Sequence, residues 1–319
     1  VLPLVIFWPI VFAMIAGVVI WNTARIFGWP LPADLPPPPT PDVPLPFPLT
    51  HLWFLYVLVW FYAAMLLFRA PFALVDRGGA LRGLLDRFVG LLVQTNLLPV
   101  VLGLLCGYAL WTNPAWFILG GVPTPDNSLI PNTYAAIAYG LAFAMGWALQ
   151  RQPDLLAVWR RRWLLNLAGA IALTVACLAL SEGQPSNMPA PQSGRSLAYA
   201  LCYGVAMWGW VMGLTGAALA FLDRHSPAIR YLADSSYWVY LMHLPLVLAL
   251  PVAVSNVSGV PAELKFAGIV IVSIAILLAT YQLLVRNSFI GWLLNGRRKP
   301  GKAGKSAIPA TAAGAEGTL

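Results

Sequence analysis

The chain has 319 residues, of which 60% are hydrophobic and 9% are charged, and its formal net charge is +8. Soluble domains contain about a quarter charged residues, so this composition excludes an ordinary water-soluble protein. The basic residues fall in short clusters between apolar runs and form no nucleic-acid-binding motif, which argues against nucleic acid as a partner. Membrane lipids are the expected surroundings of most of the chain.

Apolar runs of about 20 residues recur along the whole chain and predict an all-α fold, a polytopic transmembrane helical bundle. Eight spans are predicted, at residues 1–21, 51–68, 88–111, 134–150, 163–181, 197–221, 235–254 and 264–285. They form one membrane-embedded domain over residues 1–295. The basic segment 296–319 has few large apolar side chains and is expected to be a disordered tail.

The first run begins at Val1, without an initiator methionine, a basic leading segment or a cleavage site, so it does not resemble a signal peptide. We expect the chain to be N-terminally incomplete. Two glycine patterns predict close helix packing: Gly103 with Gly107, and Gly209 and Gly213 with Ala217.

Positive charge alternates between successive connections. Of the 19 basic residues, only Arg25, Arg195 and Lys265 fall in one alternate set of connections, and the other sixteen fall in the second set. An excess of arginine and lysine marks the cytoplasmic side, so both the visible start and the C-terminus are expected there. The Pro-rich loop at 22–50 then faces outside, with polyproline II as its expected conformation.

Two histidines are the main candidates for chemistry. His51 opens a span at the outer face, and His243 lies about nine residues into its span, roughly 12 to 13 Å from the inner end and near the bilayer midplane. Tyr240 and the carbonyl released by a kink at Pro245 are candidate partners of His243, and the segment Asp234–Ser236 is the expected helix N-cap. A histidine at 243 that only hydrogen-bonds a neighbouring helix, and an interfacial histidine at 51 without a catalytic role, stay open as alternatives.

Metal and nucleotide chemistry has no support in the sequence. The three cysteines lie inside apolar runs, and no metal-binding, hydrolase-elbow or nucleotide-loop motif appears. We therefore expect no metal site and no bound cofactor.

Three stretches together resemble the acyltransferase 3 family of membrane proteins: HLWFLYVL from His51, SSYWVYLMHLPL from Ser235 and FIGWLLNGRR from Phe289. Their order is most similar to the branch of glucan biosynthesis protein C-like succinyltransferases. The resemblance implies about ten spans, of which eight are visible here, in the bacterial inner membrane. It also implies transfer of an acetyl- or succinyl-type group from cytoplasmic acyl-CoA, as donor substrate, to a hydroxyl of an outer-face glycan or lipid-linked sugar.

In this family, a histidine in the first span is commonly assigned as catalytic, and no residue of this chain matches it. The resemblance therefore implies a principal catalytic histidine upstream of Val1, with His51 and His243 as supporting catalytic residues and Tyr240 as a substrate contact. A lipid or glycan transporter and a non-catalytic structural membrane subunit stay open as alternatives, because apolar spans with few charges fit both. The oligomeric state is left open.

Overall fold

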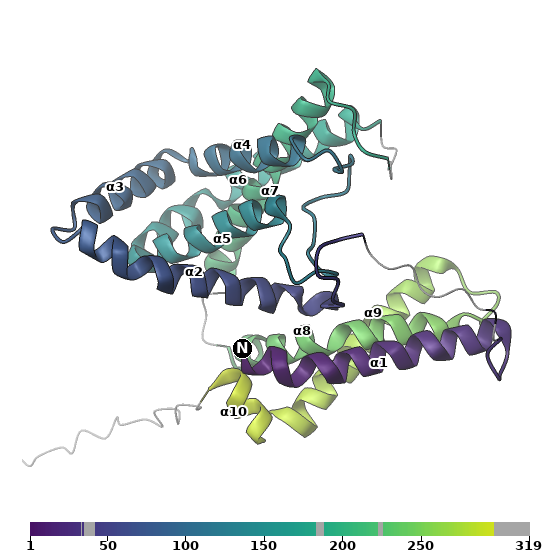
Figure 1. The fold of residues 1–319 in the computed structure, drawn as a ribbon. Coiled ribbons are helices and arrows are strands. Elements are labelled where there is room, and N and C mark those ends of the chain that lie inside the picture. Colours follow the sequence, from purple (N-terminus) through teal and green to yellow (C-terminus); the bar gives the residue numbers. More distant parts are fainter. Residues whose placement is uncertain (33, 35–41, 183–187, 223–225, 297–319) are drawn as a thin grey trace, which may run out of the picture.

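The computed structural model describes residues 1–32, 34, 42–182, 188–222 and 226–296, and these residues form helices and one isolated bridge (Figure 1). The elements are α1 (Leu2–Phe27), η1 (Thr50–Leu52), α2 (Trp53–Val75), α3 (Ala80–Thr95), α4 (Leu98–Trp111), α5 (Thr133–Arg151), η2 (Pro153–Leu155), α6 (Leu156–Leu180), α7 (Gly194–Phe221), α8 (Pro227–Val254), α9 (Ala262–Thr280), η3 (Tyr281–Val285) and α10 (Phe289–Asn295). The all-α prediction is confirmed. The predicted tail, after Gly296, and the centre of the Pro-rich loop lie outside the described residues.

Six helical segments in the described part of the chain are long and apolar enough to cross a membrane, or seven if one bent pair counts as a span. The six overlap six of the predicted spans. The predicted span 134–150 is present as helix α5, but it is not among the candidates, since tyrosines, glycines and a glutamine dilute its aliphatic residues. The predicted count of eight is therefore not confirmed.

The predicted span 88–111 is broken. Helices α3 and α4 meet at a bend of 103° instead of forming one straight helix. Asn96 ends α3 in the left-handed conformation, with φ of 62°, which asparagine tolerates better than most residues. Its Nδ2 donates a hydrogen bond of 3.0 Å to Asn166 Oδ1 on α6, so the corner of the bend is attached to a neighbouring helix.

The helices form two groups around separate buried clusters (Figure 1). One cluster joins α3, α4, α5, α6 and α7, and includes Trp159 and Trp208. The other joins α1, α8 and η3 through Phe7, Trp238 and Tyr281, and also takes in Leu52 of η1. The next residue, Trp53, contacts Tyr139 of α5 with ring centroids 4.9 Å apart. The start of α2 therefore lies between the two groups.

Glycines bring α4, α6 and α7 into backbone contact, as predicted. A Cβ at Gly103 would overlap the backbone of Gly204 and Val205, and one at Gly107 would overlap the Ala200 carbonyl. A Cβ at Gly213 would overlap the Leu167 side chain of α6, and one at Gly209 would lie 3.1 Å from Cβ of Ala170 on the same helix. Close approach of this kind replaces the hydrophobic driving force that helices lack in lipid.

The described end of the Pro-rich loop is paired with a second loop. The N–H groups of Phe47 and Thr50 donate to the carbonyls of Asn127 and Asp126, at 2.9 and 3.1 Å, and Leu129 N–H donates to the Leu45 carbonyl. These bonds hold the backbone immediately before His51.

The turn between α2 and α3 is organised by Asp76, whose side chain is only 2% exposed. Its carboxylate accepts the N–H groups of Leu81 and Arg82 and pairs with Arg82 Nε at 2.8 Å. Burial alone would raise the pKa of this carboxyl, but the Arg82 side chain and the two N–H groups outweigh it and hold the pKa below its usual value of 3.8.

We predict that Asp76→Asn makes the protein less stable at neutral pH, since the ionised carboxylate contributes stability above its unfolded-state pKa. That contribution is lost as the pH falls through the lower folded-state pKa. The gap in thermal stability between wild type and variant should be constant above about pH 5 and should shrink at more acidic pH. A gap that widens in acid would contradict this assignment.

We predict that Gly204→Ala destabilises the protein by about 1 to 3 kcal/mol, because the added methyl group would overlap the Gly103 carbonyl. Gly169→Ala on α6 is the matched control. Nothing lies within 4 Å of a Cβ at that site, so alanine should be neutral or slightly stabilising. Thermal unfolding in detergent compares the two, and equal melting temperatures would exclude close α4–α7 packing.

Candidate functional site

His51 and His243 lie side by side, with ring centroids 4.9 Å apart and ring planes 78° apart. They come from η1, just before α2, and from the middle of α8. The sequence placed them at different depths, one at the outer face and one near the midplane. Contacting rings share one depth, so those two expectations cannot both hold.

The predicted start of the α8 span explains the discrepancy. The helix begins at Pro227, with Ser226 as N-cap accepting the Ile229 N–H, and not at Asp234–Ser236. Ser235 and Ser236 instead donate to carbonyls one turn earlier. About 24 Å of helix therefore precedes His243, about twice the 12 to 13 Å expected from the span predicted at 235–254. Hydropathy missed this extension because residues 228–234 are helix formers of mixed polarity.

Pro245 determines the partner of His51. Proline has no N–H, so the carbonyl of Leu241, four residues earlier on α8, receives no helical hydrogen bond from it. His51 Nε2 lies 3.1 Å from this carbonyl. A carbonyl can only accept, so Nε2 carries the proton and Nδ1 of the neutral ring has the lone pair. Nδ1 is buried and has no hydrogen-bond partner in the structure. The kink carbonyl was predicted as a partner of His243, and that prediction is wrong.

His243 has the opposite tautomer. Its Nδ1 lies 2.8 Å from the backbone carbonyl of Tyr240, so in the neutral ring Nδ1 carries the proton. Its half-buried ring leaves Nε2 with a lone pair, and no described residue bonds to that atom. Two imidazole lone pairs thus occur in one small aromatic cluster.

Tyr240, the predicted substrate contact, lies in the same cluster as the two histidines. Its hydroxyl donates to the backbone carbonyl of His51 at 2.8 Å, and its ring centroid lies 5.7 Å from that of His51. The hydroxyl is therefore engaged in positioning η1 against α8.

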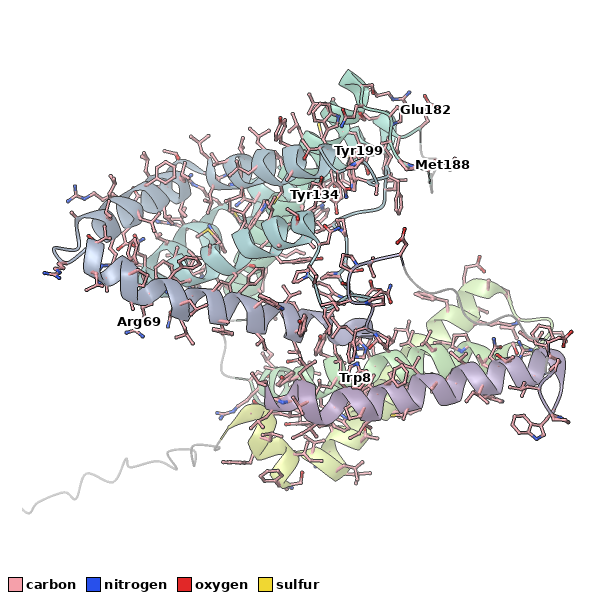
Figure 2. The ribbon with its side chains drawn as sticks, viewed as in Figure 1. Trp8, Arg69, Tyr134, Glu182, Met188 and Tyr199 are labelled. Atoms are coloured by element: carbon pink, nitrogen blue, oxygen red, sulfur yellow. The ribbon has the colours of Figure 1, made fainter. Side chains whose placement is uncertain are left out.

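Two residues that the sequence analysis missed also position His51. Trp8 on α1 donates its indole N–H to the Pro48 carbonyl at 2.9 Å, and its ring stacks on Phe47. Figure 2 labels Trp8 on the side of α1 that faces the start of α2. Thr50 has a φ of 54°, which is rare for a β-branched residue and costs about 1 to 3 kcal/mol. Such strain is typical of segments that present a functional side chain.

An apolar groove lies along the part of α8 that follows His243. It has a volume of about 320 Å³ and lies between α1 and α8, lined by Met14, Gly17, Val18, Trp21, Pro245, Leu246 and Ala249. Its size and composition suit an alkyl chain. Among the residues the structure describes, no three His, Cys, Asp or Glu side chains gather to hold a metal ion.

The comparison with known families identifies the chain. No curated protein and no protein of solved structure gives a match. The family model of the acyltransferase 3 type, described as an acyltransferase domain, matches residues 1–283, which include both histidines and Tyr240. Because the match covers most of the sequence, the chain belongs to the acyltransferase 3 family of membrane acyltransferases.

Proposed function

We propose that this protein transfers an acetyl- or succinyl-type group from acyl-CoA to a hydroxyl of a glycan or lipid-linked sugar. The observation that carries the proposal is the His51–His243 pair, with its two unpaired ring nitrogens, in a chain of an acyltransferase family. Family membership disfavours the transporter and structural-subunit alternatives. The resemblance of SSYWVYLMHLPL to glucan biosynthesis protein C-like enzymes favours a succinyl group and a glucan-type acceptor.

His243 supports the proton transfer that this reaction needs. The acceptor oxygen attacks the thioester carbonyl carbon while Nε2 of His243 takes the hydroxyl proton. The new C–O bond forms, the C–S bond breaks, and the imidazolium gives the same proton to the departing sulfur. Products are the ester and the free thiol of CoA, so no further reactant is needed.

His51 and the groove complete the proposed arrangement. The lone pair on His51 Nδ1 lies within the same cluster and favours the positive charge that forms transiently on His243. The groove between α1 and α8 offers an apolar place for the alkyl part of a lipid-linked acceptor.

The proposed orientation follows from the basic residues. Sixteen of the 19 arginines and lysines fall in the alternate set of connections that includes the α2–α3 and α5–α6 turns. The positive-inside rule then supports cytoplasmic termini in a bacterial inner membrane, with the segment before His51 toward the outer face. Donor and acceptor would reach the protein from opposite sides.

We predict that His243→Leu in the full-length gene product lowers acyl transfer by about a hundredfold or more per inserted molecule. Leucine is well tolerated in lipid, so the membrane level should change little. Free CoA thiol released from acetyl- and succinyl-CoA measures the donor side, and acyl label in glycan and lipid fractions measures the acceptor side. Wild-type activity per inserted molecule would reject a catalytic role for His243.

His51→Gln is the companion variant. The glutamine amide keeps an N–H donor for the Leu241 carbonyl but removes the ring lone pair, so it separates the structural bond from the chemistry. We expect unchanged melting and an activity loss of about tenfold or more. Loss of stability with full residual activity would assign His51 to structure alone.

We predict that Pro245→Ala disturbs the tautomer of His51. Alanine restores an N–H that competes for the Leu241 carbonyl, so the ring is no longer held with its proton on Nε2. Nitrogen chemical shifts of His51 should report mixed tautomers, and the pH profile of transfer should change. Pro251→Ala on the same helix is the control, because Pro251 releases the Val247 carbonyl instead. Equal effects of the two variants would contradict the tautomer argument.

A further inference from the structure

A second cavity lies apart from the histidines. It has a volume of about 390 Å³, within the range of small-molecule sites, and it is lined by Gln94, Val158, Arg161 and Arg162. Gln94 belongs to the last turn of α3, and the other three belong to the first turns of α6. None of the four lining residues is acidic.

The bend between α3 and α4 accounts for the cavity. A straight span would continue past Gln94, but the chain turns through 103° at Asn96 and α3 leaves the line of α4. The Asn96–Asn166 hydrogen bond closes this corner against α6. Discontinuous helices of this kind line ligand sites in other membrane proteins, because irregular backbone is tolerated in a bilayer only where it faces protein or a cavity.

The two arginines of the cavity have no carboxylate partner among the residues that the structure describes. Arg82, Arg151 and Arg195 each pair with a carboxylate, at 2.8, 2.6 and 2.8 Å. Within the described ranges, Arg161 and Arg162 have no such partner. Two neighbouring guanidinium groups beside an amide favour an anion with several acceptor oxygens, and phosphate groups match their fork geometry.

A buried donor lies next to the arginines. Asn166 is 4% exposed, and its Nδ2 has no hydrogen-bond partner in the structure. It follows Arg162 by one helical turn, on the same side of α6. Asn166 is not among the residues that line the cavity, so we assign it no contact with a ligand there.

We propose that the α3–α6 cavity binds a phosphate-bearing ligand through Arg161 and Arg162, with Gln94 as a further polar contact. This assignment rests on the proposed function and extends it. The ligand is then the phosphorylated end of the acyl-CoA donor. The same chemistry occurs in the headgroups of anionic lipids, so the test separates these two sources.

Binding is measured on the full-length gene product in nanodiscs of uncharged phosphatidylcholine, with free coenzyme A as probe and calorimetry as readout. We expect the double variant R161Q/R162Q to weaken coenzyme A binding at least tenfold. The matched control is R77Q/R230Q, which removes the same two charges outside the cavity and should bind as wild type. Single variants R161Q and R162Q replace the double variant if its melting temperature is lowered.

A second arm adds phosphatidylglycerol to the nanodiscs and uses inorganic phosphate as competitor. Arginine-dependent enrichment of phosphatidylglycerol, without coenzyme A binding, would keep the phosphate site and overturn the donor assignment. Coenzyme A binding that survives R161Q/R162Q, or falls equally in the control, would overturn the site. Binding is measured without turnover. If coenzyme A binds through Arg161 and Arg162 in a protein that releases no CoA thiol from acyl-CoA, the proposed function is rejected and this inference stands.

Discussion

The hydrogen bond from His51 Nε2 to the Leu241 carbonyl is the contact on which the candidate site depends. A carbonyl without a partner costs several kcal/mol in a bilayer, and Pro245 creates such a carbonyl in the middle of α8. His51 satisfies it from the start of another helix. One missing N–H therefore joins the two groups of helices, determines the tautomer of one histidine and brings that ring against His243.

The remaining contacts around His51 serve the same placement. The Tyr240 hydroxyl holds the His51 backbone, Trp8 holds Pro48, and the loop at 126–127 holds Phe47 and Thr50. The strain at Thr50 persists because these bonds together determine the backbone there. Each ring is bonded to a carbonyl through one nitrogen, which leaves a lone pair on the second nitrogen of the neutral ring.

Both candidate sites occur where a helix is interrupted. Pro245 interrupts the hydrogen bonding of α8 beside the histidines, and the turn at Asn96 interrupts a span beside the arginine cavity. Elsewhere α4, α6 and α7 pack through glycines with few polar groups. Irregular backbone is tolerated in a bilayer only where it faces protein or a cavity, and the proposed proton transfer and the proposed anion binding fall at two such places.

Composition and periodicity were enough to predict an all-helical membrane protein, its glycine contacts and two histidines of interest, because these follow from local hydropathy and spacing. The break at Asn96 was missed, since hydropathy averages over a residue whose positive φ lies at a bend of 103°. The start of α8 was missed because its first turns are helical without being apolar. The meeting of His51 with α8 joins residues 190 apart in sequence and was decided by tertiary packing, which alone determines where a proline-released carbonyl finds its donor.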